Sequence, residues 1–432
     1  MELKKYKLGE LTQVTRGASL GGEYYATQGN YIRLTCGNFD YRNNCFKENQ
    51  SKDNIYYVGD FKEEFLLDKD DIITPLTEQA IGLLGSTARI PESGKYIQSQ
   101  DIAKIDCNES LLDKNFAFYL ISSACVKQQL SAAAQQTKIR HTSPDKIKDC
   151  TVWIPSLDVQ KRIGRILTDI DNKIAINRQI NDNLEAMAKQ LYDYWFVQFD
   201  FPNEEGKPYK SSGGAMVWNE KLKRKIPQGW SDCVLGDYIG RITNGLNPRK
   251  NFVLGSGNNY YVTIRSLVGT TIDWNNCDRC DDKALSKINS RSQLQIGDII
   301  FSTIGTIGRT YYILEEPTNW NISETSFTLR AKENVPNDFF YGMLRSNEIQ
   351  IKADKAAMGS TLRCLIMDSL CSLQYIKIPS YMMKLFSAKV SPLYRQIHRN
   401  NKEIAELTKQ RDELLPLLMN GQATVNYHLS DD

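Results

Sequence analysis

The sequence of 432 residues contains few side chains at spacings that catalysis or metal binding would use. Its three histidines, His141, His398 and His428, lie far apart along the chain and predict no acid–base pair. Cys277 and Cys280 form the closest cysteine pair, but neither a second CxxC nor a nearby histidine completes the roughly four ligands that zinc needs. We therefore expect no metal site in this chain and free thiols for its ten cysteines.

Two short motifs come near to nucleotide chemistry without completing it. Residues 304–310 read IGTIGRT, which lacks the GK[ST] element of a phosphate-binding loop, so a turn at a strand end is the better interpretation. Residues 247–250 read NPRK, which lacks the second proline and the aromatic residue of the motif that holds an extruded base in a DNA methyltransferase. The chain is therefore predicted to perform no catalysis alone.

If this chain reads DNA, the side chains that could do so are the arginine, lysine and amide groups in predicted loops. Arginine and amide groups make bidentate contacts with base edges, whereas lysine mostly contacts phosphates. The candidates are Arg16, Arg33, Gln79, Lys138 and Arg140 in the first half, and Asn244, Asn247, Arg249, Lys250, Arg265, Arg309 and Arg363 in the second half. For each of them, a solvated surface charge or an ion pair within the fold is the alternative.

Any contact with nucleic acid must come from local patches, because 54 basic and 51 acidic residues give a net charge of only +3. The basic run KLKRK at 221–225 lies beside a Gly/Ser/Pro-rich stretch, and we interpret it as a solvated linker rather than as a phosphate contact. No stretch approaches the roughly 20 consecutive apolar residues of a membrane helix. The N-terminus also lacks a secretion signal, so we expect a cytoplasmic protein.

The elements that would position these side chains occur twice. Four pairs of segments repeat in the same order at offsets of 223 to 227: LGEL at 8–11 and LGDY at 235–238, DDIITP at 70–75 and GDIIFS at 297–302, Arg140 and Arg363, WIPS at 153–156 and KIPS at 377–380. Arg140 and Arg363 are favoured among the candidates because both halves keep arginine there. A shared residue indicates a shared role such as phosphate positioning, whereas unlike loops indicate that the halves read different sequences.

Each half begins with short β-branched or aromatic runs, contains helical segments, and ends in a long helix. The predicted class is α+β, with two similar mixed domains separated by two long antiparallel coiled-coil helices. The predicted order is a first domain at 1–155, a first helix at 156–198, a linker at 199–230, a second domain at 231–380, a second helix at 381–421 and a tail at 422–432. The Pro, Gly and Ser content of the linker predicts neither helix nor strand there.

Both long helices carry a seam with alternating steps of three and four residues. The predicted first seam is Ile163, Ile166, Ile170, Lys173, Asn177, Ile180, Leu184, Met187 and Leu191. The predicted second seam is Phe386, Val390, Leu393, Ile397, Asn400, Ile404, Leu407, Arg411, Leu414 and Leu418. Asn177 and Asn400 occupy equivalent positions, and a polar residue in an apolar seam fixes register and partner.

Two matched seams favour packing of the helices on each other over helices that only cap their own domains. The first seam would be about 43 Å long, which is roughly the length of 13 base pairs. The aromatic residues that end the first helix, Tyr192, Tyr194, Trp195 and Phe196, could close a local core or form a surface for a partner.

Several longer segments resemble the specificity subunits of type I restriction-modification systems. They are LEAMAKQLYDYWFVQFDFPNEEGKPYKSSGG at 184–214, IPQGW at 226–230, RDELLPLLMNG at 411–421 and TSPDKIKDCTVWIPSLDVQKRI at 142–163. The resemblance covers essentially the whole chain. The segments GSTLRCLIMDSL and IPSYMMKLF of the second half are less regular than their counterparts in the first half.

The resemblance implies that two target-recognition domains each read one part of a split, asymmetric double-stranded DNA sequence and that the helices set the gap. It also implies two modification subunits, which supply S-adenosylmethionine, and restriction subunits, which use ATP and Mg. No cofactor is then expected in this chain, and no individual base contact carries over. The alternatives are a recognition chain for an enzyme whose methylation and cleavage share one polypeptide, a coiled-coil scaffold for proteins, and a stand-alone methyltransferase, which the missing motifs disfavour.

Overall fold

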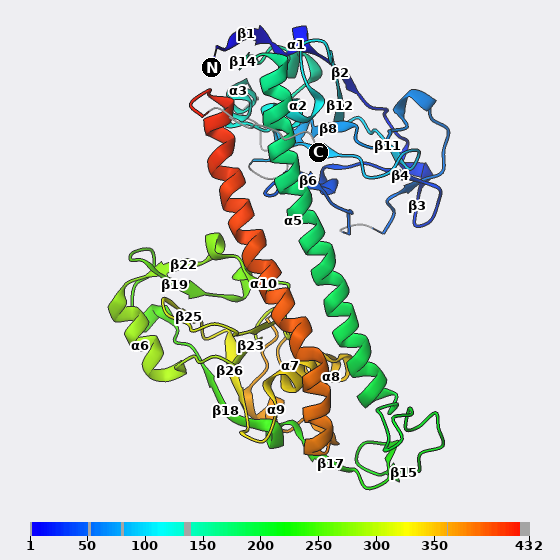
Figure 1. Ribbon diagram of the computed structural model, residues 1–432, viewed down its shortest axis with the longest axis vertical. Coiled ribbons are helices and arrows are strands. Elements are labelled where there is room, and N and C mark those ends of the chain that lie inside the picture. Colours follow the sequence, from blue (N-terminus) through cyan, green and yellow to red (C-terminus); the bar gives the residue numbers. More distant parts are fainter. Residues whose placement is uncertain (1, 51–52, 79–81, 134–139, 361, 424–432) are drawn as a thin grey trace. The chain divides into compact units, whose positions relative to one another are not determined.

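The computed structural model describes residues 2–50, 53–78, 82–133, 140–360 and 362–423 (Figure 1). The chain divides into two compact units. Unit 1 contains residues 1–175 and 404–432, and unit 2 contains residues 176–403. Each unit combines a globular α+β region, called domain 1 or domain 2 below, with a segment of each of two long helices, α5 (Leu157–Tyr192) and α10 (Ser380–Met419). The predicted class of two α+β domains with two long helices is confirmed.

Domain 1 is built on two four-stranded sheets. The first sheet is antiparallel in the order β10 (Ala88–Arg89), β8 (Ile72–Pro75), β12 (Ile102–Cys107) and β2 (Thr12–Arg16). The second sheet has the order β11 (Tyr96–Ile97), β4 (Tyr31–Arg33), β7 (Tyr56–Tyr57) and β3 (Tyr25–Ala26). Smaller pairs are β1 (Lys4–Lys7) with β14 (Thr151–Ile154), β9 (Thr77–Glu78) with β13 (Arg140–His141), and β5 (Phe39–Asp40) with β6 (Cys45–Phe46).

The helices of domain 1 are α1 (Leu8–Leu11), α2 (Lys114–Ile121), α3 (Ala124–Ala133) and α4 (Pro144–Lys148). The Asp113 carboxylate caps α2 by accepting a hydrogen bond from the Phe116 N–H at 2.9 Å, as expected for an N-cap aspartate. The apolar face of α2 lies in the same core as Ile163 and Leu167 of α5 and Leu418 of α10. Domain 1 is therefore packed directly on both long helices.

Domain 2 repeats this plan. Its main sheet has the order β18 (Ile239–Asn244), β26 (Ser326–Ala331), β23 (Ile299–Ser302) and β24 (Thr310–Tyr312). A three-stranded sheet follows in the order β22 (Asp278–Cys280), β19 (Asn259–Val262) and β25 (Trp320–Ile322). The pairs are β17 (Ser231–Val234) with β27 (Gln374–Lys377) and β20 (Leu267–Val268) with β21 (Thr271–Ile272). The helices are α6 (Asp282–Ser292), α7 (Asn337–Arg345), α8 (Asn347–Ala356) and α9 (Met367–Cys371).

The internal repeat extends to strand order and register. Strands β10, β8, β12 and β2 of domain 1 correspond in order to β24, β23, β26 and β18 of domain 2, and both sheets are antiparallel. Each second sheet contains one parallel pair, β4 with β11 and β19 with β25. The short echoes in the sequence therefore mark one fold that is built twice.

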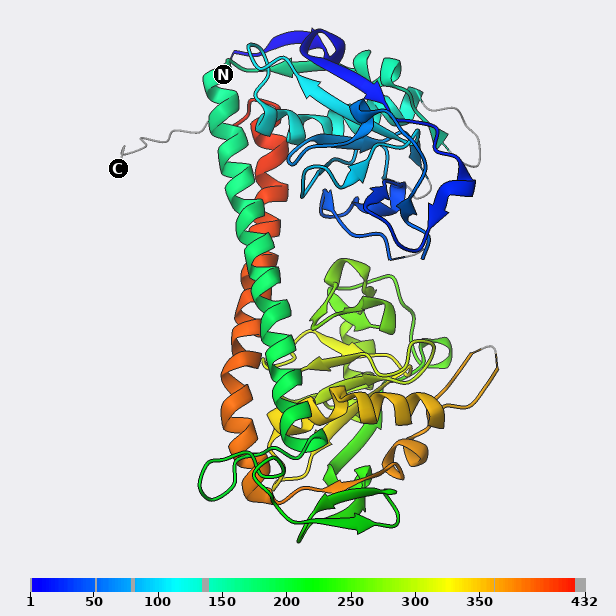
Figure 2. The ribbon, with the colours of Figure 1, turned by 90° about the vertical axis from the view of Figure 1, so that its right-hand side faces the viewer.

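The long helices run antiparallel and side by side within each unit (Figures 1 and 2). In unit 2, Asn177 donates a hydrogen bond to Glu403 at 2.9 Å, and Asn400 donates to Asn181 at 2.8 Å. The residue numbers rise on α5 as they fall on α10, which defines the antiparallel direction. Helix α5 ends in one π-helical turn, Asp193–Val197. Among the described residues, no helix is long and apolar enough to cross a membrane.

The first predicted seam requires a correction. Ile180 and Met187 are 40% and 53% exposed, and Lys173 is exposed, so these positions do not lie between the helices. The buried positions beside Ile163 and Asn177 are instead Leu167, Ile174, Asn181 and Ala188. The error arose because α5 carries a second apolar stripe on its surface, whereas its real seam includes a buried asparagine and an alanine. The remaining positions of both seams, Ile170, Leu184, Leu191, Leu393, Asn400, Leu407 and Leu414 among them, are buried or half-buried.

The predicted linker also requires a correction, because it contains a β-hairpin. Strands β15 (Met216–Asn219) and β16 (Arg224–Pro227) pair in this segment. Phe199, Phe201 and Ile226 are buried in the core of unit 2. Arg224, from the KLKRK run, forms an ion pair with Glu348 at 3.1 Å. Apolar residues spaced between the prolines and glycines therefore fold this segment onto domain 2. Of the predicted tail, only residues 422 and 423 are among the described residues.

The aromatic end of α5 has a divided role. Tyr192, Trp195 and Phe196 are buried and contact Phe386 of α10 with ring centroids 5.1 to 5.7 Å apart. Tyr194 is 37% exposed. Three of the four residues therefore close the local core, and the fourth faces solvent.

Candidate nucleic-acid interface

In domain 2, the turn between β23 and β24 presents Arg309 at the surface. The Arg309 Nη1 donates to the carbonyl oxygens of Ile264 at 3.1 Å and Leu267 at 3.0 Å. These bonds join the β23–β24 turn to the segment that leads into β20 and β21. A hollow of about 370 Å³ opens beside the guanidinium, and its lining includes Gly269, Gly308, Arg309, Arg345 and Gln350. Arg309 is therefore held in place and remains exposed.

A second group of predicted residues lies between β18 and β19. Asn247 caps the 3₁₀ turn Pro248–Lys250 by accepting from the Arg249 N–H at 2.9 Å, and it donates to Glu324 at 2.8 Å. Asn244 accepts a hydrogen bond from Arg291 of α6 at 2.6 Å. The amide groups at these two positions thus hold the loop, and the Arg249 side chain is left exposed. The side chain of Lys250 lies outside the described part of the structure.

Arg265 is an exposed arginine of domain 2. Its side chain is 72% exposed, and its only ion pair among the described residues is a 4.0 Å contact with Asp278. Arg279 of β22 was missed by the sequence analysis. It is exposed and lies over the Tyr260 ring at 3.8 Å from the centroid. Arg279 lies in the segment NNCDRC, between the two cysteines that were considered as metal ligands, and an arginine in such a polar segment could have been predicted to be exposed.

Arg140 and Arg363 share a role that is internal to each domain. Arg140 donates to Ser131 of α3 at 2.9 Å, and Arg363 donates to Asp354 of α8 at 2.7 Å. Ser131 and Asp354 are separated by the same 223 residues as the two arginines. Arg140 also lies 3.6 Å from the carboxylate of Glu78. The repeated arginine therefore ties the chain after each short helix back to that helix.

Arg33 is buried, which contradicts its predicted position on a DNA-reading loop. It is 6% exposed, its guanidinium stacks on Tyr25 at 3.7 Å from the ring centroid, and it donates to the Asn54 carbonyl at 3.1 Å. Arg16 is exposed at the end of β2, with Nε bonded to the Gln100 carbonyl at 2.7 Å. Gln79 and Lys138 lie outside the described residues. In domain 1, Arg16 and Arg140 are the predicted cations that the structure leaves at the surface.

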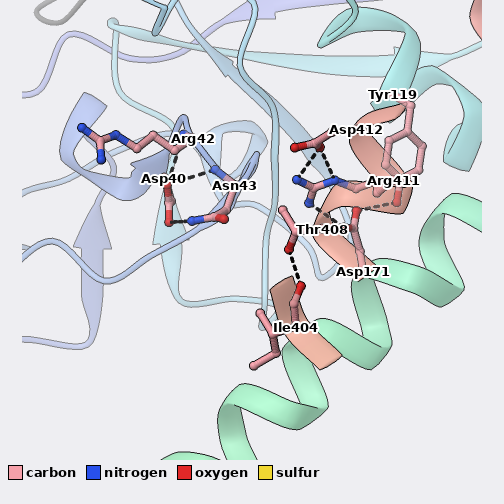
Figure 3. A network of polar contacts seen from close by, with 9 residues as sticks. All are labelled: Asp40, Arg42, Asn43, Tyr119, Asp171, Ile404, Thr408, Arg411 and Asp412. Atoms are coloured by element: carbon pink, nitrogen blue, oxygen red, sulfur yellow. Dashed lines mark hydrogen bonds and ion pairs between the residues drawn. The ribbon is translucent and has the colours of Figure 1, made fainter. Parts of the chain in front are cut away.

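The helix pair of unit 1 is held by a buried ion pair (Figure 3). Arg411 of α10 is 7% exposed, and its Nη1 donates to Asp171 of α5 at 2.9 Å. The other oxygen of Asp171 accepts from the Tyr119 hydroxyl of α2 at 2.7 Å. Burial opposes the charge of Arg411, but the carboxylates of Asp171 and Asp412 together outweigh burial and raise the pKa of the guanidinium. Asp171 therefore joins both long helices to domain 1.

A chain of hydrogen bonds serves the same purpose in unit 2. Asn181 donates to Asn401 at 2.8 Å, and Asn401 donates to Thr270 at 3.4 Å. Thr270 and Arg345 both donate to the carboxylate of Glu185, at 3.0 and 2.6 Å. The polar layer of the helix pair thus continues into the turn between β20 and β21, close in the chain to the Leu267 carbonyl that holds Arg309.

The comparisons with known proteins agree with this arrangement. Residues 1–186 match the family model described as type I restriction modification DNA specificity domain. The type I restriction enzyme MjaIX specificity subunit of Methanocaldococcus jannaschii is 26% identical over 317 residues, which cover 72% of this chain and 69% of that protein. The first 186 residues therefore match a type I restriction-modification DNA specificity domain, and the chain is similar over most of its length to a type I specificity subunit.

Two further comparisons cover most of this chain. The type I restriction enzyme HindI specificity subunit of Haemophilus influenzae is 22% identical over 378 residues, which cover 76% of this chain and 81% of that protein. The crystal structure of the S subunit of a type I restriction-modification system from M. genitalium superposes with a TM-score of 0.59 at 16% identity, over 97% of this chain and 96% of that one. The structural likeness supports the fold of two similar domains with two long helices.

Proposed function

We propose that each domain of this specificity subunit reads one half of an asymmetric, bipartite DNA sequence. The observation that carries the proposal is one sheet scaffold that occurs twice with different additions. Helix α6 precedes β23 in domain 2, whereas the corresponding segment before β8 in domain 1 contains one 3₁₀ turn, Glu63–Phe65. A common scaffold with unlike loops is suited to reading two different DNA sequences. Contacts with base edges determine which sequence is read, whereas contacts with the phosphate backbone position the protein on the duplex.

The catalytic steps in this proposal belong to partner subunits. Two modification subunits would bring S-adenosylmethionine, and restriction subunits would use ATP and Mg. The specificity subunit itself would contribute recognition and spacing, and the complex would act in the cytoplasm. The relatives that support this division of labour are themselves named specificity subunits.

An exposed apolar stripe on α5 is suited to the docking of a modification subunit. Ile176, Ile180, Met187 and Tyr194 are 54%, 40%, 53% and 37% exposed, and all four lie within unit 2. The last three are spaced by seven residues, so they recur on one face of the helix. Exposed apolar residues in a continuous stripe mark interaction sites more often than isolated ones do.

Helix α10 does not repeat the stripe. The residues 223 positions later are Arg399, Glu403, Gln410 and Leu417, of which only the last is apolar. If two modification subunits bind, their contacts with the two long helices therefore differ. The stripe on α5 would be the more apolar of the two docking surfaces.

The double substitution Ile180→Asp and Met187→Asp is expected to weaken binding of the modification subunit by about 30-fold or more. Removing an apolar side chain from the core of an interface costs at least about 1 kcal/mol, and every 1.4 kcal/mol is a factor of ten. The introduced carboxylates would also be desolvated on binding. The dissociation constant can be measured by calorimetry with the purified partner, and sequence-specific methylation should fall in parallel.

A matched control is Gln179→Asp, which adds a carboxylate to the exposed surface of the same helix outside the stripe. It should leave partner binding within about twofold of the original. If the stripe variant binds its partner as tightly as the original chain, the docking surface lies elsewhere.

A further inference from the structure

Each domain contains a glycine turn at the same place in the repeated sheet. In domain 1, Ala88 of β10 pairs with Ile73 of β8, and in domain 2, Tyr311 of β24 pairs with Ile300 of β23. This register aligns Gly85 with Gly308. Both glycines have positive φ, +78° and +88°, a conformation that other residues rarely adopt. The two turns are therefore equivalent in structure as well as in sequence.

A short helix packs closely against each turn. A Cβ on Gly85 would lie 2.8 Å from Cγ of Lys127 on α3, and a Cβ on Gly308 would lie 2.0 Å from the side-chain oxygen of Gln350 on α8. The backbone N–H groups of Lys127 and Gln350 donate to Ser123 and Ser346, respectively, both at 3.0 Å. Lys127 and Gln350 are thus equivalent positions, 223 residues apart.

We call the glycine turn and the helix residue that packs on it a corner. Each corner has one cation, which lies in the turn in domain 2 and on the helix in domain 1. In domain 2, Arg309 follows the glycine, and the helix residue is the neutral Gln350. In domain 1, the residue after the glycine is the buried Ser86, and the helix residue is Lys127. Most loop residues differ between the domains, yet a positive charge is kept at this corner. The two domains thus keep a positive charge at the corner but place it on different residues, which indicates that the charge matters more than the identity of the side chain.

Neither cation is neutralised by a carboxylate in the described part of the chain. The Nζ of Lys127 has no hydrogen-bond or ion-pair partner there, and the side chain is half-buried. Desolvation by burial lowers the pKa of Lys127. Arg309 uses only Nη1, for two carbonyl oxygens, and it faces the hollow of about 370 Å³. Arg345 on the wall of this hollow is paired with Glu185 at 2.6 Å. A half-buried cation without a counter-charge is unfavourable unless an anion binds to it.

We propose that the two corners each bind one phosphodiester group of the DNA backbone, through Lys127 in domain 1 and Arg309 in domain 2. The inference rests on the proposed reading of DNA by both domains. A phosphate contact carries no sequence information, so each corner would position its domain on the duplex rather than select bases. Lys127 was absent from the residues that the sequence suggested, because it lies within a helix rather than a loop.

The test is the salt dependence of DNA binding by the full chain assembled with its modification subunits. Lys127→Gln and Arg309→Gln should each reduce the slope of log K against log salt by about 0.9, and the double variant by about 1.8. Affinity for the target duplex and for an unrelated duplex should fall by the same factor. Lys127→Arg should keep the original slope. Arg309→Gln combined with Gln350→Lys, which gives domain 2 the arrangement of domain 1, should restore the slope.

The matched control is Lys332→Gln, which removes an exposed charge at the end of the domain 2 sheet opposite to the glycine turn. It should leave the slope unchanged. Unchanged slopes for both corner variants, with thermal melting as the check of folding, would overturn the inference. So would a fall in affinity for the target alone, because that result indicates a base contact. If the original complex shows no sequence-selective binding, the proposed function fails together with this inference.

Discussion

Replacement of Arg411 by alanine is expected to destabilise unit 1 by about 3 kcal/mol. Removing one partner of a buried ion pair costs about 3–5 kcal/mol, because the other charge remains without compensation. The lower end applies here, because the Asp171 side chain is 27% exposed and keeps the hydrogen bond from Tyr119. Hydrogen exchange should accelerate by about 100-fold for the amides of α5 and α10 that exchange only when unit 1 opens. The corresponding amides of unit 2 provide an internal reference.

A control removes the other carboxylate that contacts the same guanidinium. Asp412 accepts from Arg411 at 2.8 Å, but its side chain is 60% exposed. Asp412→Asn should therefore change the stability of unit 1 by less than about 1 kcal/mol. Combining Arg411→Met with Asp171→Leu and Tyr119→Phe removes every polar group of the pair and should recover most of the loss. Equal effects of Arg411→Ala and Asp412→Asn would show that the buried pair is not what stabilises the helices.

An insertion of four residues into both long helices is expected to lengthen the gap between the two half-sites by one to two base pairs. Four residues add about 6 Å of helix, the length of roughly two base pairs. The insertion points are after Ala175 in α5 and before Ile404 in α10, where the two units meet in the sequence. The Asp171–Arg411 pair of unit 1 and the Asn177–Glu403 bond of unit 2 are then both kept.

The gap can be read from the sequences that are methylated in cells carrying the altered chain. Both half-sequences should stay the same, because neither domain is changed. The same four residues placed after Lys221, in the turn of the β15–β16 hairpin, should leave the gap as it was. A gap that does not respond to the helix insertion would remove the argument that the helices set the spacing.

The sequence contained more information about the seams than the apolar pattern alone could provide. The second seam includes Val390, Ile397, Ile404 and Arg411. The residues 223 positions earlier are Leu167, Ile174, Asn181 and Ala188, which are buried on α5. The direct search chose Ile180 and Met187 instead, because these side chains are more apolar than asparagine and alanine. Hydrophobicity marks a candidate for burial, but it does not distinguish a buried seam from an exposed apolar stripe on the same helix.

The exposure of the candidate arginines was predictable at some positions and not at others. Arg309, Arg265 and Arg249 lie exposed in loops of domain 2, as their neighbouring glycines and prolines suggested. Arg33 differs because its burial depends on stacking against Tyr25 of β3, which β7 separates from β4 in the sheet, and local sequence does not reveal such stacking. Lys127 was missed because it lies within helix α3, whereas the candidates were sought in loops. Tertiary contacts therefore decided which cations are available.

Exchange of domain 1 tests the central claim most directly. Residues 1–155 would be replaced by the first domain of another specificity subunit that keeps apolar residues where domain 1 packs on Ile163, Leu167 and Leu418. Methylated sequences would then be mapped across the genome in cells carrying the exchanged or the original chain. Modular reading predicts that one half of the methylated sequence changes while the other half and the gap stay the same. A change in both halves, or in neither, would contradict it.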